Sequence, residues 1–314
     1  MTLRYKFSPP LLALGLTGLL TACAANTQKC TLGAAADLKV TAENRAYYTD
    51  IAINQGTAHL EIDTGAFANL LHKGVADKLQ MSQQMLWNVG AAGIGGQRDL
   101  NLAVAHTVNV GGAQGTRVQF LTVTDDAFNN AHRDGLLGMQ FMAPYDDDLD
   151  FTHGHLRLLD AKGNCSTPAT ALTGSVYAVD LESLDQVNSP VITITINGVK
   201  LHAMIDSGSV NSLMSRRTAD RTGLLNESLL ENSVNRIRGI GPRKVKAIMN
   251  RLQLPVEIGA LQISNMPVII IDGAVAPGID MLLGFDFVTL VHVWISHSSH
   301  TVLLQYPPEA TPTN

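Results

Sequence analysis

Residues 60–71 read LEIDTGAFANLL, and residues 203–214 read AMIDSGSVNSLM. Each stretch is an apolar run that is interrupted by one aspartate, a small hydroxyl residue and a glycine. A buried carboxylate is costly unless partner groups stabilise it. Because the chain places such an acid twice in matching frames, we expect Asp63 and Asp206 to be each other's partners.

The match between the two stretches extends over most of the chain. Asp63 and Asp206 are 143 positions apart, and flanking apolar residues recur at the same offset. After a three-residue insertion in the second copy, the segment 93–95 (GIG) falls on 239–241 (GIG), and 134–138 (DGLLG) falls on 280–284 (DMLLG). A period this long predicts two domain-sized copies rather than an array of short repeats.

Composition sets limits on the class of protein. The 314 residues are enough for two lobes of ordinary domain size. A hydrophobic content of 46% allows real cores, and a net charge of -5 argues against a nucleic-acid partner. No apolar run reaches the roughly 18 residues that a spanning helix needs, so we expect none in the mature protein.

The first 22 residues have the features of an export signal. Arg4 and Lys6 precede a short apolar segment, residues 11–20, which ends in LTAC at residues 20–23. That ending resembles the bacterial lipoprotein box, which implies lipidation of Cys23 and attachment to a membrane through acyl chains. Ala24 follows the cysteine where an aspartate would favour the inner membrane, so the expected location is the periplasmic side of the outer membrane. An ordinary secretory signal that happens to contain a cysteine is the alternative.

Two cysteines remain in the mature chain, Cys30 and Cys165. An even pair in an oxidising compartment is a candidate disulfide, which here would join the start of the first copy to its end. Two free thiols are the alternative, and the pair is too sparse for a zinc site.

Strand signals dominate the chain. Short β-rich runs flank the turns NQGT (54–57) and NGVK (197–200), and a short helical stretch follows each acid at 72–80 and 215–223. This pattern predicts closed or sandwiched all-β lobes. We place the lobes at 42–165 and 181–310, after a signal at 1–22, with linkers at 23–41 and 166–180.

The doubled set of motifs resembles the lobes of aspartic proteases. It is similar to the retropepsin and pepsin-like families, and most of all to bacterial retropepsin-like proteases, over most of residues 45–305. Retropepsins bring one lobe from each of two chains, whereas this chain carries both. The resemblance implies a mainly β protein with two homologous acid-protease-like β-barrel lobes, an interlobe cleft, and activity as a monomer.

The resemblance also implies roles for particular residues. Asp63 and Asp206 would form the catalytic dyad, share one proton and activate a water molecule between them. Crossed hydrogen bonds from the two hydroxyl residues would lock the loops, and the glycines would let backbone approach each acid. These supporting positions are Thr64, Gly65, Ala66, Ser207, Gly208 and Ser209. Gly138 and Gly284, each after two leucines, would pack beneath the loops.

Two further features come from the same resemblance. The hydroxyl of Ser209 can donate to its neighbouring carboxylate, whereas Ala66 cannot, so we expect the shared proton to rest on Asp63. Two glycine-rich stretches correspond to flaps that would cover a substrate, with a plain hairpin turn as the alternative for each. Their residues are Gly93, Ile94, Gly95, Gly96, Gly239, Ile240 and Gly241.

Other polar clusters fit plainer interpretations. The acidic segment YDDDLDF, residues 145–151, lacks the spacing of a calcium loop and is predicted to be a solvated turn. His153, His155, His297 and His300 are predicted to be surface strand residues, and no metal or other cofactor is expected.

The sequence therefore predicts an exported, lipid-anchored aspartic endopeptidase that acts on polypeptides and needs no cofactor. The main alternative is a non-catalytic lipoprotein of the same fold that binds peptides or envelope components. Two departures keep this alternative open: Phe67 stands where Ser or Thr is commoner, and neither flap has an obvious pepsin-type tyrosine. A purely structural envelope lipoprotein would leave both acids unexplained.

Overall fold

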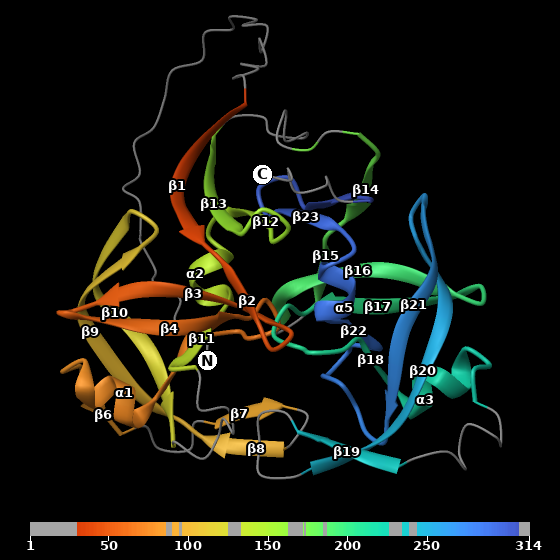
Figure 1. Cartoon of the computed structure of the whole chain (residues 1–314), viewed down its shortest axis with the longest axis horizontal. Coiled ribbons are helices and arrows are strands. Elements are labelled where there is room, and N and C mark those ends of the chain that lie inside the picture. The colour runs from red at the N-terminus through yellow and green to blue at the C-terminus, as the bar shows by residue number, and fades with distance from the viewer. Residues whose placement is uncertain are drawn as a thin grey trace, which may run out of the picture.

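A computed structural model of the chain describes residues 30–85, 90–93, 96–124, 133–162, 172, 174–184, 187–225, 234–238 and 244–307. The architecture is mainly β, with two barrels side by side and a sheet that spans them (Figure 1). This confirms the predicted fold class of two homologous β-barrel lobes. Among the described residues, no helix has the length and apolar character to cross a membrane.

The first barrel is built from the first sequence copy. Its sheet order is β2-β3-β4-β11-β5-β10-β9-β6, and an additional β3–β9 pairing closes it. The elements are β2 (Thr41–Glu43), β3 (Ala46–Ile53), β4 (Gly56–Ile62), β5 (Leu70–His72), α1 (Lys73–Lys78), β6 (Ser82–Gln84), β9 (Asn101–Val110), β10 (Ala113–Val123), β11 (Gly135–Leu137) and α2 (Met139–Met142).

The second barrel repeats this order with the second copy, as β15-β16-β17-β22-β18-β21-β20-β19, and β16–β20 closes it. The shared order confirms the internal duplication. The elements are β15 (Glu182–Leu184), β16 (Val187–Ile196), β17 (Val199–Ile205), β18 (Leu213–Ser215), α3 (Arg216–Arg221), β19 (Val234–Arg238), β20 (Lys244–Ile258), β21 (Leu261–Ile271), β22 (Met281–Leu283) and α5 (Phe285–Val288).

A six-stranded sheet joins the lobes, in the order β1-β13-β12-β23-β24-β14. Its strands are β1 (Thr31–Lys39), β12 (Asp146–Asp150), β13 (His155–Lys162), β14 (Val176–Asp180), β23 (His292–Ser296) and β24 (Thr301–Gln305). The closing hairpins of the two copies meet where β12 pairs antiparallel with β23. β1 and β14 fall within the segments that we predicted to be linkers, so those segments are partly strand.

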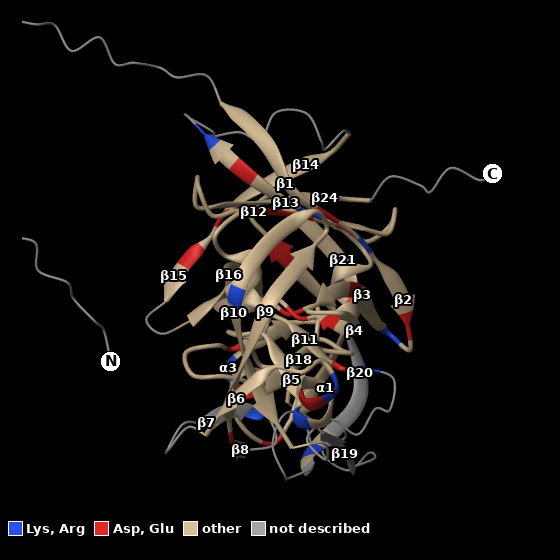
Figure 2. Cartoon of the chain, turned by 90° about the vertical axis from the view of Figure 1, so that its left-hand side faces the viewer, with Lys and Arg blue, Asp and Glu red and all other residues tan. Residues whose placement is uncertain are grey.

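The two ends of the molecule carry different structures. The six-stranded sheet forms one end, and the hairpin of β7 (Gly90–Gly93) and β8 (Gly96–Asp99) lies with β19 at the other end (Figures 1 and 2). β7 pairs with β8 up to Gly93 and Gly96, as expected for a flap-like hairpin.

Corresponding turns and core positions explain why both copies fold alike. Asn54 and Asn197 begin tight turns with φ of 53° and 49°, and each side-chain amide donates to a backbone carbonyl after the following helix. Asparagine tolerates this left-handed conformation better than most residues do. Alternate residues of the flanking strands, including Ile51, Ile53 and Ile194, are fully buried in one core that continues into the six-stranded sheet.

The structure of the acidic segment at 145–151 differs from our prediction. It is not a solvated turn, because Asp146–Asp150 form β12 and each of these residues is buried. The reason is that neighbouring strands supply polar partners for the carboxylates. His153 and His297 accordingly contact aspartates of this strand rather than standing free on the surface.

Candidate active site

The two acids leave equivalent strands at the centre of the molecule. Asp63 follows β4 and Asp206 follows β17, and each of these strands pairs in parallel with a Leu-Leu strand, β11 or β22. The backbone amide of Asp63 donates to the carbonyl of Leu137 at 3.0 Å, and that of Asp206 donates to Leu283 at 2.9 Å. Each acid therefore donates a backbone hydrogen bond to a strand of its own lobe.

Crossed hydrogen bonds lock the two loops together. The hydroxyl of Thr64 donates to the carbonyl of Ile205 at 2.7 Å and accepts from the amide of Ser207 at 3.0 Å. The hydroxyl of Ser207 donates to the carbonyl of Ile62 at 2.7 Å and accepts from the amide of Thr64 at 3.1 Å. Both hydroxyl residues are fully buried, so these bonds are shielded from water and fix one lobe against the other.

Each glycine of the two triplets lies against the acid of the opposite lobe. A Cβ atom on Gly65 would come within 2.5 Å of Oδ1 of Asp206, and a Cβ atom on Gly208 within 2.5 Å of Oδ1 of Asp63. No side chain fits at such distances. The glycines therefore permit the two carboxyl groups to approach each other across the lobe boundary.

The carboxyl groups of Asp63 and Asp206 are hydrogen-bonded to each other, and both residues are half-buried. Burial raises the pKa of both groups. The pKa of Asp206 is raised well above its usual range, because the negative charge of Asp63 adds to burial. Backbone amides of Ala66 and Gly65 both donate to Oδ1 of Asp63 at 3.0 Å and lower its pKa.

Our expectation that the shared proton rests on Asp63 depended on a hydrogen bond from the Ser209 hydroxyl to Asp206. That hydrogen bond is wrong, because the hydroxyl donates to the carbonyl of Asn211 at 2.8 Å. The backbone amide of Ser209, rather than its hydroxyl, lowers the pKa of Asp206. The hydroxyl that Ser209 has and Ala66 lacks therefore does not make the pKa values of the two acids different.

The second glycine of each copy lies directly beneath its loop. A Cβ atom on Gly138 would come within 2.8 Å of the carbonyl oxygen of Ala66, and one on Gly284 within 2.7 Å of that of Ser209. The amide of Gly138 donates to Asn69 at 2.9 Å, and the amide of Gly284 donates to Ser212 at 3.0 Å. The packing that the resemblance implied for these glycines is what the structure has.

Sequence reasoning missed several residues that hold the loops. Asn69 and Ser212 occupy equivalent positions, so the repeat offset could have identified them. Arg45 and Ser189 contact the opposite lobe: Arg45 donates to the carbonyl of Val210 at 3.0 Å, and Ser189 donates to that of Gly65 at 3.1 Å. No repeated motif identifies Arg45 and Ser189, because the contacts that these two residues make across the lobes differ between the copies.

The remaining predicted site residues are only partly described. Gly93 and Gly96 belong to the β7–β8 hairpin, whereas Ile94, Gly95, Gly239, Ile240 and Gly241 lie outside the described residues. Cys23 and Cys165 also lie outside them. Cys30 is disulfide-bonded, and its pairing with Cys165 stays a prediction. Within the described ranges, no group of His, Cys, Asp or Glu side chains is arranged to hold a metal ion.

Two barrels with Asp-Thr-Gly and Asp-Ser-Gly loops facing each other define the aspartic protease class of fold. Comparison with known families agrees, because the family described as aspartyl protease matches residues 49–141 and 192–287. The chain belongs to this family. No curated protein matches the chain.

Proposed function

We propose that the chain is an exported, lipid-anchored aspartic endopeptidase with Asp63 and Asp206 as its catalytic dyad. The observation that carries the proposal is the mutual contact of these two carboxyl groups, each against the glycine of the opposite loop. Membership of the aspartyl protease family supports hydrolytic chemistry in general. The proposed substrates of this hydrolysis are polypeptides.

The proposed mechanism divides acid and base roles between two like residues. The ionised member takes a proton from a water molecule held between the carboxyl groups. The protonated member donates a proton to the carbonyl oxygen of the scissile bond. The two apparent pKa values belong to the coupled pair, so the pH profile reports the dyad as a unit.

The test of this function is cleavage of a peptide library by the chain without its signal, residues 24–314, from about pH 3 to about pH 8. We expect cleavage that is strongest in acid. Asp50→Asn is a matched control, because Asp50 is an exposed carboxylate outside the dyad that contacts His59 at 2.7 Å. Binding of peptides without cleavage at any pH would favour the non-catalytic alternative.

Two parts of the proposal concern the state of the protein in the cell envelope. Cys23→Ser should release the protein from the membrane fraction, and a variant that stays there would contradict lipid anchoring. Because both loops come from one chain, specific activity should not fall on dilution through the nanomolar range. A steep loss on dilution would instead indicate a site shared between chains.

A further inference from the structure

The loops of the dyad carry exposed apolar side chains at equivalent positions. Phe67 lies four residues after Asp63, and Val210 lies four residues after Asp206, so the two are related by the repeat offset of 143. Their exposed fractions are 49% and 42%, and they are two of only four large apolar side chains that are exposed among the described residues. A substrate whose scissile bond reaches the dyad must pass over both loops, so these two side chains indicate where it lies.

An arginine lies beside this path, against the loop of the second lobe. Arg45 belongs to the turn between β2 and β3, and this hairpin reaches the boundary between the barrels (Figure 1). Nη2 of Arg45 donates to the carbonyl of Val210 at 3.0 Å and to Oδ1 of Asn211 at 3.5 Å. The guanidinium carbon also lies 5.4 Å from the centre of the Phe285 ring. Arg45 is thus held next to the loop that carries Asp206.

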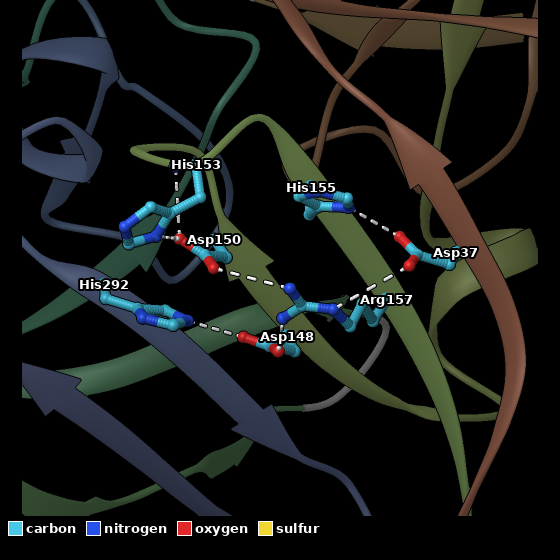
Figure 3. Close-up of polar contacts among 7 residues, drawn as sticks. All are labelled: Asp37, Asp148, Asp150, His153, His155, Arg157 and His292. Atoms are coloured by element: carbon cyan, nitrogen blue, oxygen red, sulfur yellow. Dashed lines mark hydrogen bonds and ion pairs between the residues drawn. The ribbon is translucent and has the colours of Figure 1, made fainter. Parts of the chain in front are cut away.

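These contacts do not balance the charge of Arg45. A carbonyl, an amide oxygen and an aromatic ring are all neutral, and Arg45 is exposed. Arg157 of the six-stranded sheet is different, because carboxylate oxygens of Asp148 and Asp150 lie 2.6 Å and 3.6 Å from its guanidinium (Figure 3). Within the described part of the chain, Arg45 therefore keeps donors and a full positive charge that a carboxylate from outside can use.

The backbone at Arg45 also indicates a functional role. Asn44 and Arg45 have positive φ, at 50° and 63°, in the two-residue turn that joins Glu43 to Ala46. Glycine is favoured at the second position of such a turn, and an arginine there is strained. Strained residues of this kind cluster at sites of binding and catalysis. The turn therefore favours a need for the arginine side chain at this position.

The equivalent contact in the other direction has no charge. At the offset of 143 residues, Arg45 falls on Asn188 and Ala46 falls on Ser189, whose hydroxyl donates to the carbonyl of Gly65 at 3.1 Å. The loop of the first lobe is thus contacted by a neutral hydroxyl, whereas the loop of the second lobe is contacted by a cation. These contacts give the two ends of a bound peptide different surroundings.

We propose that Arg45 determines the specificity of the peptidase by binding an acidic side chain of the polypeptide substrate, beside Val210 on the second-lobe side of the dyad. The remaining donors of the guanidinium bind the carboxylate through hydrogen bonds and charge together. The inference rests on the proposed function, because it takes a peptide to cross the dyad. It adds a substrate class, which is peptides with an acidic residue near the cleaved bond, and a direction in which they bind.

The test uses a peptide that the wild type cleaves, made again with a single Glu or the isosteric Gln at each position around the cleaved bond in turn. At about pH 6, where Glu is ionised, kcat/KM for the Glu peptide should exceed that for the Gln peptide by about five- to tenfold at one position on one side of the bond, mainly through KM. Arg45→Gln should reduce this ratio to about one, because glutamine keeps a donor for the carbonyl of Val210 but has no charge. Arg45→Glu should reverse the preference, so that a Lys peptide is cleaved faster than the Gln peptide.

Lys200→Gln is the matched control, because Lys200 is an exposed cation of the second lobe at the opposite end of β17 from Asp206. It should keep the wild-type ratio of the Glu and Gln peptides. A merely structural role of Arg45 would lower kcat/KM for both peptides in Arg45→Gln and leave their ratio unchanged. That result, or a ratio near one at every position in the wild type, would overturn the proposal while peptide cleavage itself, and so the proposed function, still stands.

Two further measurements cover the remaining outcomes. If Arg45→Gln does not fold, the wild-type ratio should fall toward one as salt is raised from about 0.05 M to about 1 M, because salt screens an exposed ion pair, and an unchanged ratio would overturn the proposal. If no peptide is cleaved, the proposed function fails, and binding of labelled library peptides that differ only by Glu for Gln decides the role of Arg45. Tighter binding of the Glu peptides by the wild type but not by Arg45→Gln would support that role, and equal binding by the wild type would overturn it.

Discussion

Asp147 offers the clearest quantitative prediction, through the substitution Asp147→Asn. Its side chain faces the core side of the interlobe sheet, is fully buried, and has one oxygen, Oδ1, without a hydrogen-bond partner. Burial raises its pKa from 3.8 to about 6, against the opposing effect of the hydrogen bond from His297. The folded protein therefore binds this proton more tightly than the unfolded chain does.

The sign and size of the effect follow from that difference. Below about pH 3 the acid is mostly protonated in both states and has no pH-dependent cost. As the pH rises through about 6, the folded state must ionise a buried group, and stability is lost. A difference of about two pKa units, at about 1.4 kcal/mol for each unit, corresponds to about 3 kcal/mol in total, most of which is lost between about pH 4 and about pH 8.

Asp147→Asn should remove this loss, because asparagine does not titrate. The free energy of unfolding, measured by urea at intervals from about pH 4 to about pH 8, should change in favour of the variant by about 2 to 3 kcal/mol relative to the wild type. The constant cost of placing an amide at the site cancels in this comparison. A difference between variant and wild type that stays the same across the range would refute the reasoning.

Three further predictions concern the site. Thr64→Val removes the hydroxyl that bonds the buried carbonyl of Ile205 and the amide of Ser207. It should lower the free energy of unfolding in urea by about 2 to 4 kcal/mol, whereas Thr64→Ser, which keeps the hydroxyl, should lower it by only about 1 kcal/mol. Gly65→Ala should abolish peptide cleavage, because its Cβ atom would collide with Asp206. Gly33→Ala should leave cleavage unchanged, because its Cβ atom would lie 3.9 Å from the nearest atom, and an active Gly65→Ala variant would contradict the glycine contact. Ser209→Ala should leave both limbs of the kcat/KM profile against pH in place, since the hydroxyl bonds a carbonyl rather than the dyad, and a clear shift of the acid limb would contradict that geometry.

The repeat allowed much of the fold to be predicted from the sequence. Matching triplets, turns and Leu-Leu-Gly segments are local signals, and they located both barrels and the two loops that meet. The strands β1 and β14 escaped prediction because they pair with distant hairpins rather than with sequence neighbours. Their apolar alternation is weak, since both lie at the edges of the interlobe sheet.

The acidic strand was misjudged for a related reason. Four aspartates in five residues favour solvent when they are considered alone. Their partners, such as His292 and Ser296, lie more than 140 residues away along the chain. The orientation of the Ser209 hydroxyl was likewise a matter of local geometry, because a nearby carbonyl competed successfully with the carboxylate.

The most direct test of the account is peptide turnover by the single variants Asp63→Asn and Asp206→Asn. Each variant replaces one member of a proton-sharing pair with a nearly isosteric amide, so the fold should be kept while one catalytic role is lost. Circular dichroism and urea unfolding serve as the check on folding. We predict that both variants lose turnover by at least about a thousandfold while Asp50→Asn retains it. Near wild-type turnover by either folded variant would contradict the dyad.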